Sequence, residues 1–299
     1  MKKFLLMMAI AALGLQSCQE NRLSPLTIDN TLTAQEKAEK RLTPEVIWKF
    51  SRASQSSLSP DGAWLLYAQT DYSMAENRGV TTLWKENVAT KEVVKLSDTS
   101  STATAPTWSA DGESIFFLSN RSGSMQLWKM TAAGEDPQQV SDFTFDIEGY
   151  GIAPSEDKAW YVRTVHVADR RSADVHKDMD KSKARIYDDL MVRHWDYWEE
   201  GDYRHIFVAD LQEGKLAEGV DIIGAEAAWD APLAPYFDMA EIAWNNAGTV
   251  LAYTGKPLTG TAYAVSTDSD IYLYEVATGK TKNICKPSEE AREVMPGYD

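Results

Sequence analysis

The sequence contains few cysteines and histidines. Its 299 residues include two cysteines, so at most one internal disulfide is possible and stability must come from packing. The four histidines lie 10, 18 and 11 residues apart, without a cysteine between them, which matches no common pattern of zinc ligands. We therefore predict no metal site among them. They are His166, His176, His194 and His205.

Long apolar segments and basic clusters are also missing. After the first 17 residues, no segment approaches the roughly 20 apolar residues of a transmembrane helix. The chain has 45 acidic and 30 basic residues and a formal net charge of −15, which would repel a polyanion. No glycine-rich phosphate loop is present. We therefore predict neither a nucleic-acid partner nor a cofactor.

The amino terminus predicts an export signal. Lys2 and Lys3 precede an apolar run over residues 4–15, which is too short to span a bilayer. Residues 15–18, Leu-Gln-Ser-Cys, resemble the bacterial lipobox, where cleavage precedes a lipidated cysteine. We predict a lipoprotein signal peptide over residues 1–17 and a membrane anchor on Cys18. The alternative is an ordinary signal peptide with an incidental cysteine.

The lipid anchor has consequences for the rest of the chain. It would place the protein in the bacterial cell envelope, facing the periplasm or the cell surface. Residues 18–41 are polar and predict a tether with a short helix near residues 34–40. A lipidated Cys18 leaves Cys285 without a partner, and we predict that Cys285 is a small buried hydrophobic residue.

One sequence unit recurs from residue 42 onward. It consists of a short strand, a turn with Pro, Asp, Asn or Gly, and an alternating aromatic and aliphatic strand. Each copy is followed by a second pair of strands, over 83–96, 127–140, 206–215 and 271–284. Asp-Gly and Thr-Gly turns favour hairpins because glycine adopts positive φ readily. The copies span residues 57–67, 107–117, 152–161 and 243–253.

The period of this unit predicts the fold class. Asp111 follows Asp61 by 50 residues and Asp157 follows Asp111 by 46, close to the roughly 40 to 50 residues of a four-stranded propeller blade. We predict an all-β chain in which residues 42–299 form an incomplete β-propeller. It would contain about four blades and the start of a fifth, which is too little to close.

The third unit contains an insertion. About 39 residues, 166–204, separate its strands, where the other units have about 10 to 20. Residues 172–190 are charged and predict an exposed helix. Residues 191–205 combine four large aromatic side chains with two histidines, two arginines and four acids, which is the most site-like stretch of the chain.

Residues 193–198, Arg-His-Trp-Asp-Tyr-Trp, are similar to a propeller segment of bacterial dipeptidyl and acylaminoacyl peptidases in the prolyl oligopeptidase family. The opening Leu-Thr-Pro-Glu at residues 42–45 and the Ser-Pro-Asp-Gly turn fit the same family. The resemblance implies a propeller that caps an α/β-hydrolase domain, whose nucleophile lies in Gly-x-Ser-x-Gly. That pentapeptide is absent here, so we predict no catalytic residue in this chain.

The same resemblance implies a role for the insertion in substrate binding. Relatives that remove dipeptides hold the free amino terminus with paired glutamates, for which Glu199 and Glu200 are candidates; the alternative is a solvated hairpin turn. Arg193 is a candidate for pairing with a substrate carboxylate or for a structural ion pair. Trp195, Tyr197 and Trp198 are candidates for substrate contacts or for the core or a domain interface.

Two functions follow from these predictions. The first is the substrate-filtering propeller of an exported serine peptidase that hydrolyses short peptides, with a catalytic α/β-hydrolase domain outside this sequence. The fragment alone would then be inactive. The second is a non-enzymatic envelope propeller of the Tol type that binds protein partners. The aromatic and acidic insertion favours the peptidase, because a Tol-type propeller needs no such elaboration.

Overall fold

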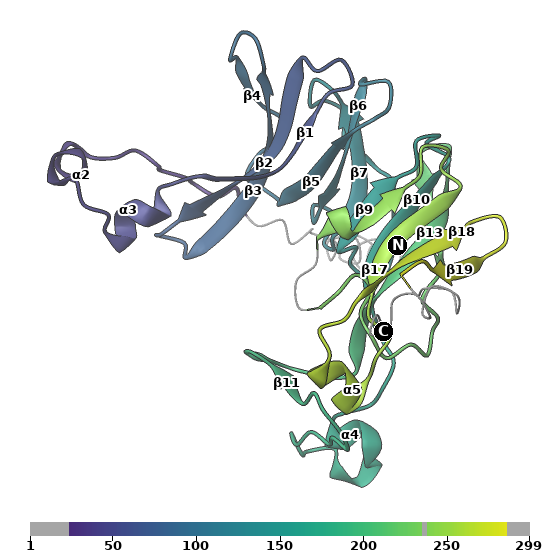
Figure 1. Ribbon diagram of the computed structural model, residues 1–299. Coiled ribbons are helices and arrows are strands. Elements are labelled where there is room, and N and C mark those ends of the chain that lie inside the picture. The colour runs from purple at the N-terminus through teal and green to yellow at the C-terminus, as the bar shows by residue number, and fades with distance from the viewer. Residues whose placement is uncertain (1–23, 235–237, 286–299) are drawn as a thin grey trace, which may run out of the picture.

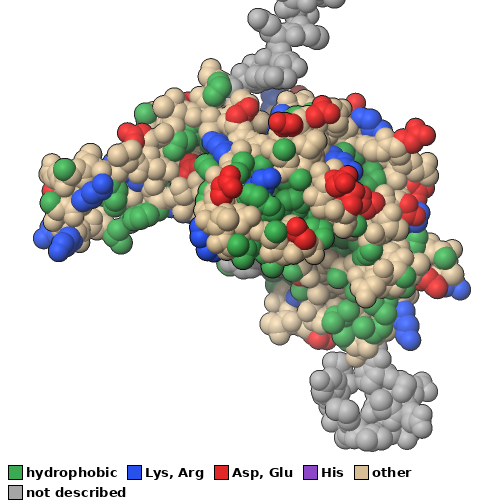
Figure 2. All heavy atoms as spheres, turned by 90° about the horizontal axis from the view of Figure 1, so that it is seen from above, with side chains coloured by type: hydrophobic (Ala, Val, Ile, Leu, Met, Phe, Trp, Pro, Cys, Tyr) green, Lys and Arg blue, Asp and Glu red, His purple; other side chains and the backbone are tan. Residues whose placement is uncertain are grey.

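The computed structural model describes residues 24–234 and 238–285. The predicted signal peptide, Cys18 and the predicted start of a fifth unit lie outside the described residues. Within them, no helix is both long and apolar enough to cross a membrane. Acidic side chains are spread over the face seen in Figure 2, with hydrophobic side chains between them, in keeping with the negative net charge.

The chain is mostly β, and each sequence unit forms one antiparallel sheet, of four strands in the first, second and fourth units and of five in the third. The first sheet contains β1 (Arg52–Leu58), β2 (Trp64–Ser73), β3 (Arg78–Asn87) and β4 (Val93–Lys95). The second contains β5 (Ala103–Trp108), β6 (Ser114–Ser119), β7 (Gln126–Thr131) and β8 (Gln138–Gln139). In both sheets the strands pair in chain order, which confirms the predicted repeat.

The third and fourth units repeat this order. The third contains β9 (Gly149–Ile152), β10 (Lys158–His166), β13 (Asp202–Gln212) and β14 (Lys215–Leu216), with β15 (Val220–Asp221) also paired to β13. The fourth contains β16 (Ile242–Trp244), β17 (Val250–Gly255), β18 (Asp270–Glu275) and β19 (Lys280–Asn283). Figure 1 shows the four sheets following one another, with the first and fourth at the two ends.

The turn chemistry explains why these hairpins form. Asp61 accepts hydrogen bonds from the Ser59 hydroxyl at 2.5 Å and the Ala63 N–H at 3.0 Å, while Gly62 adopts φ +72°. In the second unit, Asp111 accepts from the Ser109 hydroxyl at 2.6 Å in the same way. In both turns an aspartate side chain thus closes the turn, and glycine supplies the positive φ, whereas in the third unit Glu156 has φ +54°.

The core consists of three layers between consecutive sheets. Phe117 packs toward the first sheet with Leu66 and Leu83, whereas its neighbour Phe116 packs toward the third sheet with Tyr161. In β10 the alternation recurs, because Trp160 belongs to the layer shared with the fourth sheet. Adjacent residues of one strand therefore enter different layers, as the period of two predicts.

The segment before the first sheet is partly packed against it. Leu26, in the predicted tether, is 3% exposed and donates its N–H to the Thr99 carbonyl at 3.2 Å. The predicted short helix is present as α2 (Ala34–Glu39), which begins with a capping box between Thr33 and Glu36. A second helix, α3 (Pro44–Trp48), leads into β1.

The insertion spans residues 167–201, between β10 and β13, and differs from its predicted structure. The helix predicted over residues 172–190 is limited to α4 (Ser172–Val175) and the 3-10 turn η1 (Lys177–Met179). A long helix is not formed because this charged stretch has no apolar stripe to bury. The hairpin β11 (Arg193–His194) and β12 (Tyr197–Trp198) follows.

Two further elements and one correction concern the fourth unit. The 3-10 turn η2 (Met239–Glu241) precedes β16, and α5 (Gly260–Val265) connects β17 with β18. Cys285, which we predicted to be buried, is exposed. It follows β19, the edge strand of the fourth sheet, and no other described strand pairs with β19 on that side. Its Sγ accepts a hydrogen bond from the Ile271 N–H at 3.2 Å.

The ends of the insertion meet at Gly201. The Gly201 carbonyl accepts hydrogen bonds from the N–H groups of Val167 at 2.8 Å and Ala168 at 3.2 Å. Gly201 has φ +86°, and a Cβ atom there would overlap the Ala168 carbonyl. Only glycine fits, so this contact fixes the residues that follow β12.

We expect Gly201→Ala to lower the free energy of unfolding by about 3 kcal/mol or more, because it combines steric overlap with an unfavourable φ. Gly214→Ala is the matched control, since Gly214 has φ +73° and open space around it. It should cost only about 1 kcal/mol. Urea denaturation of both variants measures the difference, and equal losses would show that the Ala168 contact is unimportant.

Candidate ligand pocket

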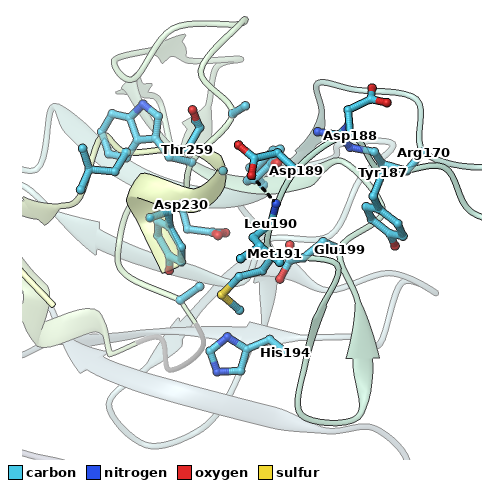
Figure 3. A pocket seen from close by; sticks show the side chains of 17 residues that line it. Arg170, Tyr187, Asp188, Asp189, Leu190, Met191, His194, Glu199, Asp230 and Thr259 are labelled. Atoms are coloured by element: carbon cyan, nitrogen blue, oxygen red, sulfur yellow. Dashed lines mark hydrogen bonds between the residues drawn. The ribbon is translucent and has the colours of Figure 1, made fainter. Parts of the chain in front are cut away.

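A pocket of about 270 Å³ lies where the insertion of the third unit meets two later segments of the chain. These are the connection that follows β15 and the residues around α5. Figure 3 shows Arg170, Tyr187 and Asp188 on one side, Asp230 and Thr259 on the other, and Glu199 between them. The charged and titratable residues of its lining are Arg170, Tyr187, Asp188, Asp189, His194, Glu199, Tyr203, Asp230 and Tyr263.

Two of the pocket acids are poorly hydrated. Burial raises the pKa of Glu199, and the nearby negative charge of Asp230 adds to this effect. Burial likewise raises the pKa of Asp230, although its carboxylate accepts a hydrogen bond from the Arg204 N–H at 2.9 Å. Both carboxylates would gain from a cation in the pocket, because an opposite charge favours their ionised form.

The segment that carries Asp230 is held by contacts of a buried histidine. His205 is fully buried, and its Nδ1 lies 2.8 Å from Asp221 while its Nε2 lies 2.9 Å from the Ala227 carbonyl. Both partners are hydrogen-bond acceptors, and together they fix the orientation of the His205 ring. The N–H of Ala231 donates to the Arg204 carbonyl at 2.9 Å. These contacts fix the segment that carries Asp230 against β13.

Glu199 is held by the residue that follows it. Glu200 forms ion pairs with Arg171 and Arg185, and the Arg185 Nε lies 2.9 Å from its carboxylate. These hydrogen bonds, that of Arg171 first, lower the pKa of Glu200. The two arginines pair as an antiparallel bridge of the insertion. Glu200 therefore joins both arms of the insertion while the Glu199 side chain lines the pocket.

The opposite wall belongs to the fourth unit. Asp189 accepts hydrogen bonds from the Thr261 N–H at 3.1 Å and the Thr261 hydroxyl at 2.5 Å, and the latter lowers the pKa of Asp189. The Asp189 carboxylate lies against the α-carbon of Gly260, where any Cβ would overlap it. This contact connects α5 directly to the insertion, so the pocket depends on both units.

The residues predicted from the sequence are divided between different places. Glu199 lines the pocket, whereas Glu200 pairs with arginines instead. The hairpin turns at Trp195 and Asp196, not at the Glu199–Glu200 pair that we had considered as a turn. Trp195 is 62% exposed, and Tyr197 and Trp198 are also exposed, which places them outside the core of the described chain. Arg193 lies 5.7 Å from the Trp198 ring.

Several pocket residues were not predicted from the sequence. Asp230, Trp229, Arg170 and Tyr263 all line the pocket. Asp230 and Trp229 come from a segment between repeats that carries no motif, and Tyr263 lies in the next unit. Charge alone could have indicated Arg170, which is one of two adjacent arginines at the start of the insertion.

The histidines are distributed over different contacts. His166 lies between Asp169 and Asp202, at 3.0 Å and 2.7 Å, and these two hydrogen bonds raise its pKa. His194 stacks on Tyr197 with the ring centroids 5.9 Å apart and lines the pocket. Within the described residues, no group of three or more His, Cys, Asp or Glu side chains is arranged to hold a metal ion.

Comparison with known proteins shows what this chain is similar to. No protein-family model matches the chain. Over most of its length, however, the chain is homologous to peptidases of the prolyl oligopeptidase family, which confirms the resemblance predicted from the sequence.

The relatives are dipeptidyl-peptidase 5 proteins. The one from Porphyromonas gingivalis is 35% identical over 260 residues, which are 87% of this chain and 36% of the relative. The one from Porphyromonas endodontalis is 33% identical over 271 residues, 91% of this chain and 38% of the relative. The chain thus spans little more than a third of their length.

A solved structure shows the same fold. The acylaminoacyl peptidase of Pyrococcus horikoshii matches 80% of this chain and 33% of its own with a TM-score of 0.54, at 16% sequence identity. The four-stranded sheets are therefore arranged in this chain as in part of that protein.

The raised pKa of Asp230 predicts a change in stability with pH. In the unfolded chain the Asp230 carboxyl has its usual pKa, whereas in the folded chain its pKa is raised. The folded state therefore loses stability as the pH rises from the unfolded pKa through the folded pKa. Asp230→Asn removes the charge and keeps an oxygen for the Arg204 N–H. We expect it to raise the Tm at pH 7 by roughly 2 to 4 °C and to have no effect near pH 4.

Differential scanning calorimetry at both pH values measures this effect. Glu226→Gln is the matched control, because Glu226 is an exposed acid in the same connection and should leave the Tm unchanged. A lower Tm for Asp230→Asn at pH 7 would show that the ionised carboxylate stabilises the fold.

Proposed function

We propose that the chain is the propeller part of an exported serine peptidase that hydrolyses short peptides, and that its pocket binds the free amino terminus of the peptide. The four sheets would be blades of a propeller over residues 42–299. The catalytic groups would come from an α/β-hydrolase domain outside this sequence, and the lipid on Cys18 would hold the protein at the cell envelope. The homology to dipeptidyl-peptidase 5 and the acidic pocket support this proposal.

The observation that carries the amino-terminal role is the pair of poorly hydrated carboxylates, Glu199 and Asp230. A buried carboxylate is unfavourable unless a cation or hydrogen-bond donors compensate it. The α-ammonium group of a peptide brings one positive charge and three donors, which suits two carboxylates better than one. The sequence predicted that Glu199 acts together with Glu200, but Glu200 forms ion pairs with two arginines. In this proposal Asp230 takes the place of Glu200.

Binding of the amino terminus would set which peptide bond is cleaved. A peptide that is fixed at its first residue presents its following bonds at fixed distances, since each extended residue spans about 3.3–3.6 Å. A blocked amino terminus has no charge, so it would leave both carboxylates buried without a cation beside them. The pocket would then accept short peptides with a free amine and reject acetylated ones. A protein-binding Tol-type propeller would have no need of such discrimination.

Calorimetric titration of the full chain with alanyl-alanine amide at pH 7.5 tests this role, with its N-acetyl derivative as the comparison. We expect acetylation to weaken binding at least about tenfold, because it removes the charge-assisted hydrogen bonds. Glu199→Gln and Asp230→Asn should each weaken binding of the free amine by about tenfold or more. Glu226→Gln should bind as the unaltered chain does.

The pH dependence provides a second reading of the same experiment. The pKa values of both acids are raised, so both become protonated at a higher pH than ordinary carboxylates do. The affinity for the free amine should therefore fall already as the pH drops below neutrality. The proposed role is wrong if the acetylated peptide binds as well as the free one, or if the two pocket variants bind like Glu226→Gln.

A further inference from the structure

Arg170 is the one arginine or lysine among the described residues of the pocket lining. It lies at the start of the insertion, where its carbonyl accepts a hydrogen bond from the Ile186 N–H at 2.7 Å. Tyr203 also lines the pocket, where burial raises its pKa, and the positive charge of Arg170 close to it acts to lower that pKa against the larger effect of burial. Figure 3 shows Arg170 on the side of the pocket away from Asp230.

The neighbouring arginines are already paired. Arg171 and Arg185 bind Glu200, and Arg204 binds Glu148 at 2.9 Å. Among the described residues, Arg170 takes part in no ion pair, although four acids line the same pocket. A guanidinium presents five donors in a planar fork that matches a carboxylate. Arg170 can therefore accept a carboxylate from a ligand without breaking a structural ion pair.

The charge balance of the pocket limits what such a ligand can be. Four acids and one arginine leave the lining negative, so a simple anion would be repelled. A ligand that brings a carboxylate to Arg170 must also bring a positive charge for Glu199 and Asp230. A short peptide with both termini free satisfies both requirements, and an extended dipeptide is about 7 Å long.

We propose that Arg170 forms a carboxylate subsite, so that the pocket binds a free dipeptide as a zwitterion, with its ammonium at Glu199 and Asp230 and its carboxylate at Arg170. This inference rests on the proposed function and adds to it. Hydrolysis adds water to the amide bond, which leaves a carboxylate on the dipeptide and an ammonium on the remaining peptide. The dipeptide product therefore gains a partner in Arg170 that the substrate lacks, and it would be retained as an inhibitor.

Calorimetric titration of the full chain with alanyl-alanine and with its amide at pH 7.5 tests this subsite, since the two ligands differ only in the carboxylate. We expect the free acid to bind about tenfold more tightly than the amide. Arg170→Gln should abolish this preference and leave the affinity for the amide unchanged. Arg170→Lys, which keeps the charge but loses the fork, should retain a preference of a few-fold.

Lys183→Gln is the matched control, because Lys183 is an exposed cation of the same insertion that does not line the pocket. It should keep the full preference for the free acid. The subsite is wrong if the unaltered chain binds acid and amide equally, or if Arg170→Gln weakens both to the same extent. A failure of the amino-terminal role looks different, because then the acetylated peptide would bind as well as the free amine.

Discussion

The second and third sheets of this protein must be covered on both faces, and the rest of the structure depends on this requirement. Phe116 and Phe117 are adjacent in β6 and enter two different core layers, as Trp160 and Tyr161 do in β10. A sheet that is apolar on both faces needs a neighbour on each side, so the units pack in series. The layer between the third and fourth sheets brings α5 next to the insertion and thereby creates the pocket.

The pocket combines groups that stabilise the fold with groups that do not. Glu200, His205 and Asp189 are paired with arginines, a carboxylate and a threonine, and these pairs fix the walls. Glu199 and Asp230 are in no ion pair among the described residues, and burial raises the pKa of both. Such a division is typical of binding sites, where a charge of the ligand compensates buried charges that no group of the protein neutralises.

Sequence reasoning identified the repeat because its signals are local. Asp61 and Asp111 close their turns with hydrogen bonds to serines two residues away. The alternation of side chains along each strand is visible directly in the sequence. Glu199 was identified through its aromatic and acidic neighbourhood. Asp230 was not, because its place beside Glu199 depends on contacts between His205, Asp221 and a connecting segment. The exposed Cys285 was misjudged since an apolar neighbour does not reveal that a strand lies at a sheet edge.

The division of the pocket between two units has a consequence for its synthesis. The insertion with Glu199 leaves the ribosome before α5 with Tyr263, by 64 residues along the chain. At about 5–20 residues per second, this delay is roughly 3 to 13 seconds. During that interval Asp189 lacks Thr261, and the acids of the insertion have no second wall. The pocket is therefore complete only after its fourth unit has folded.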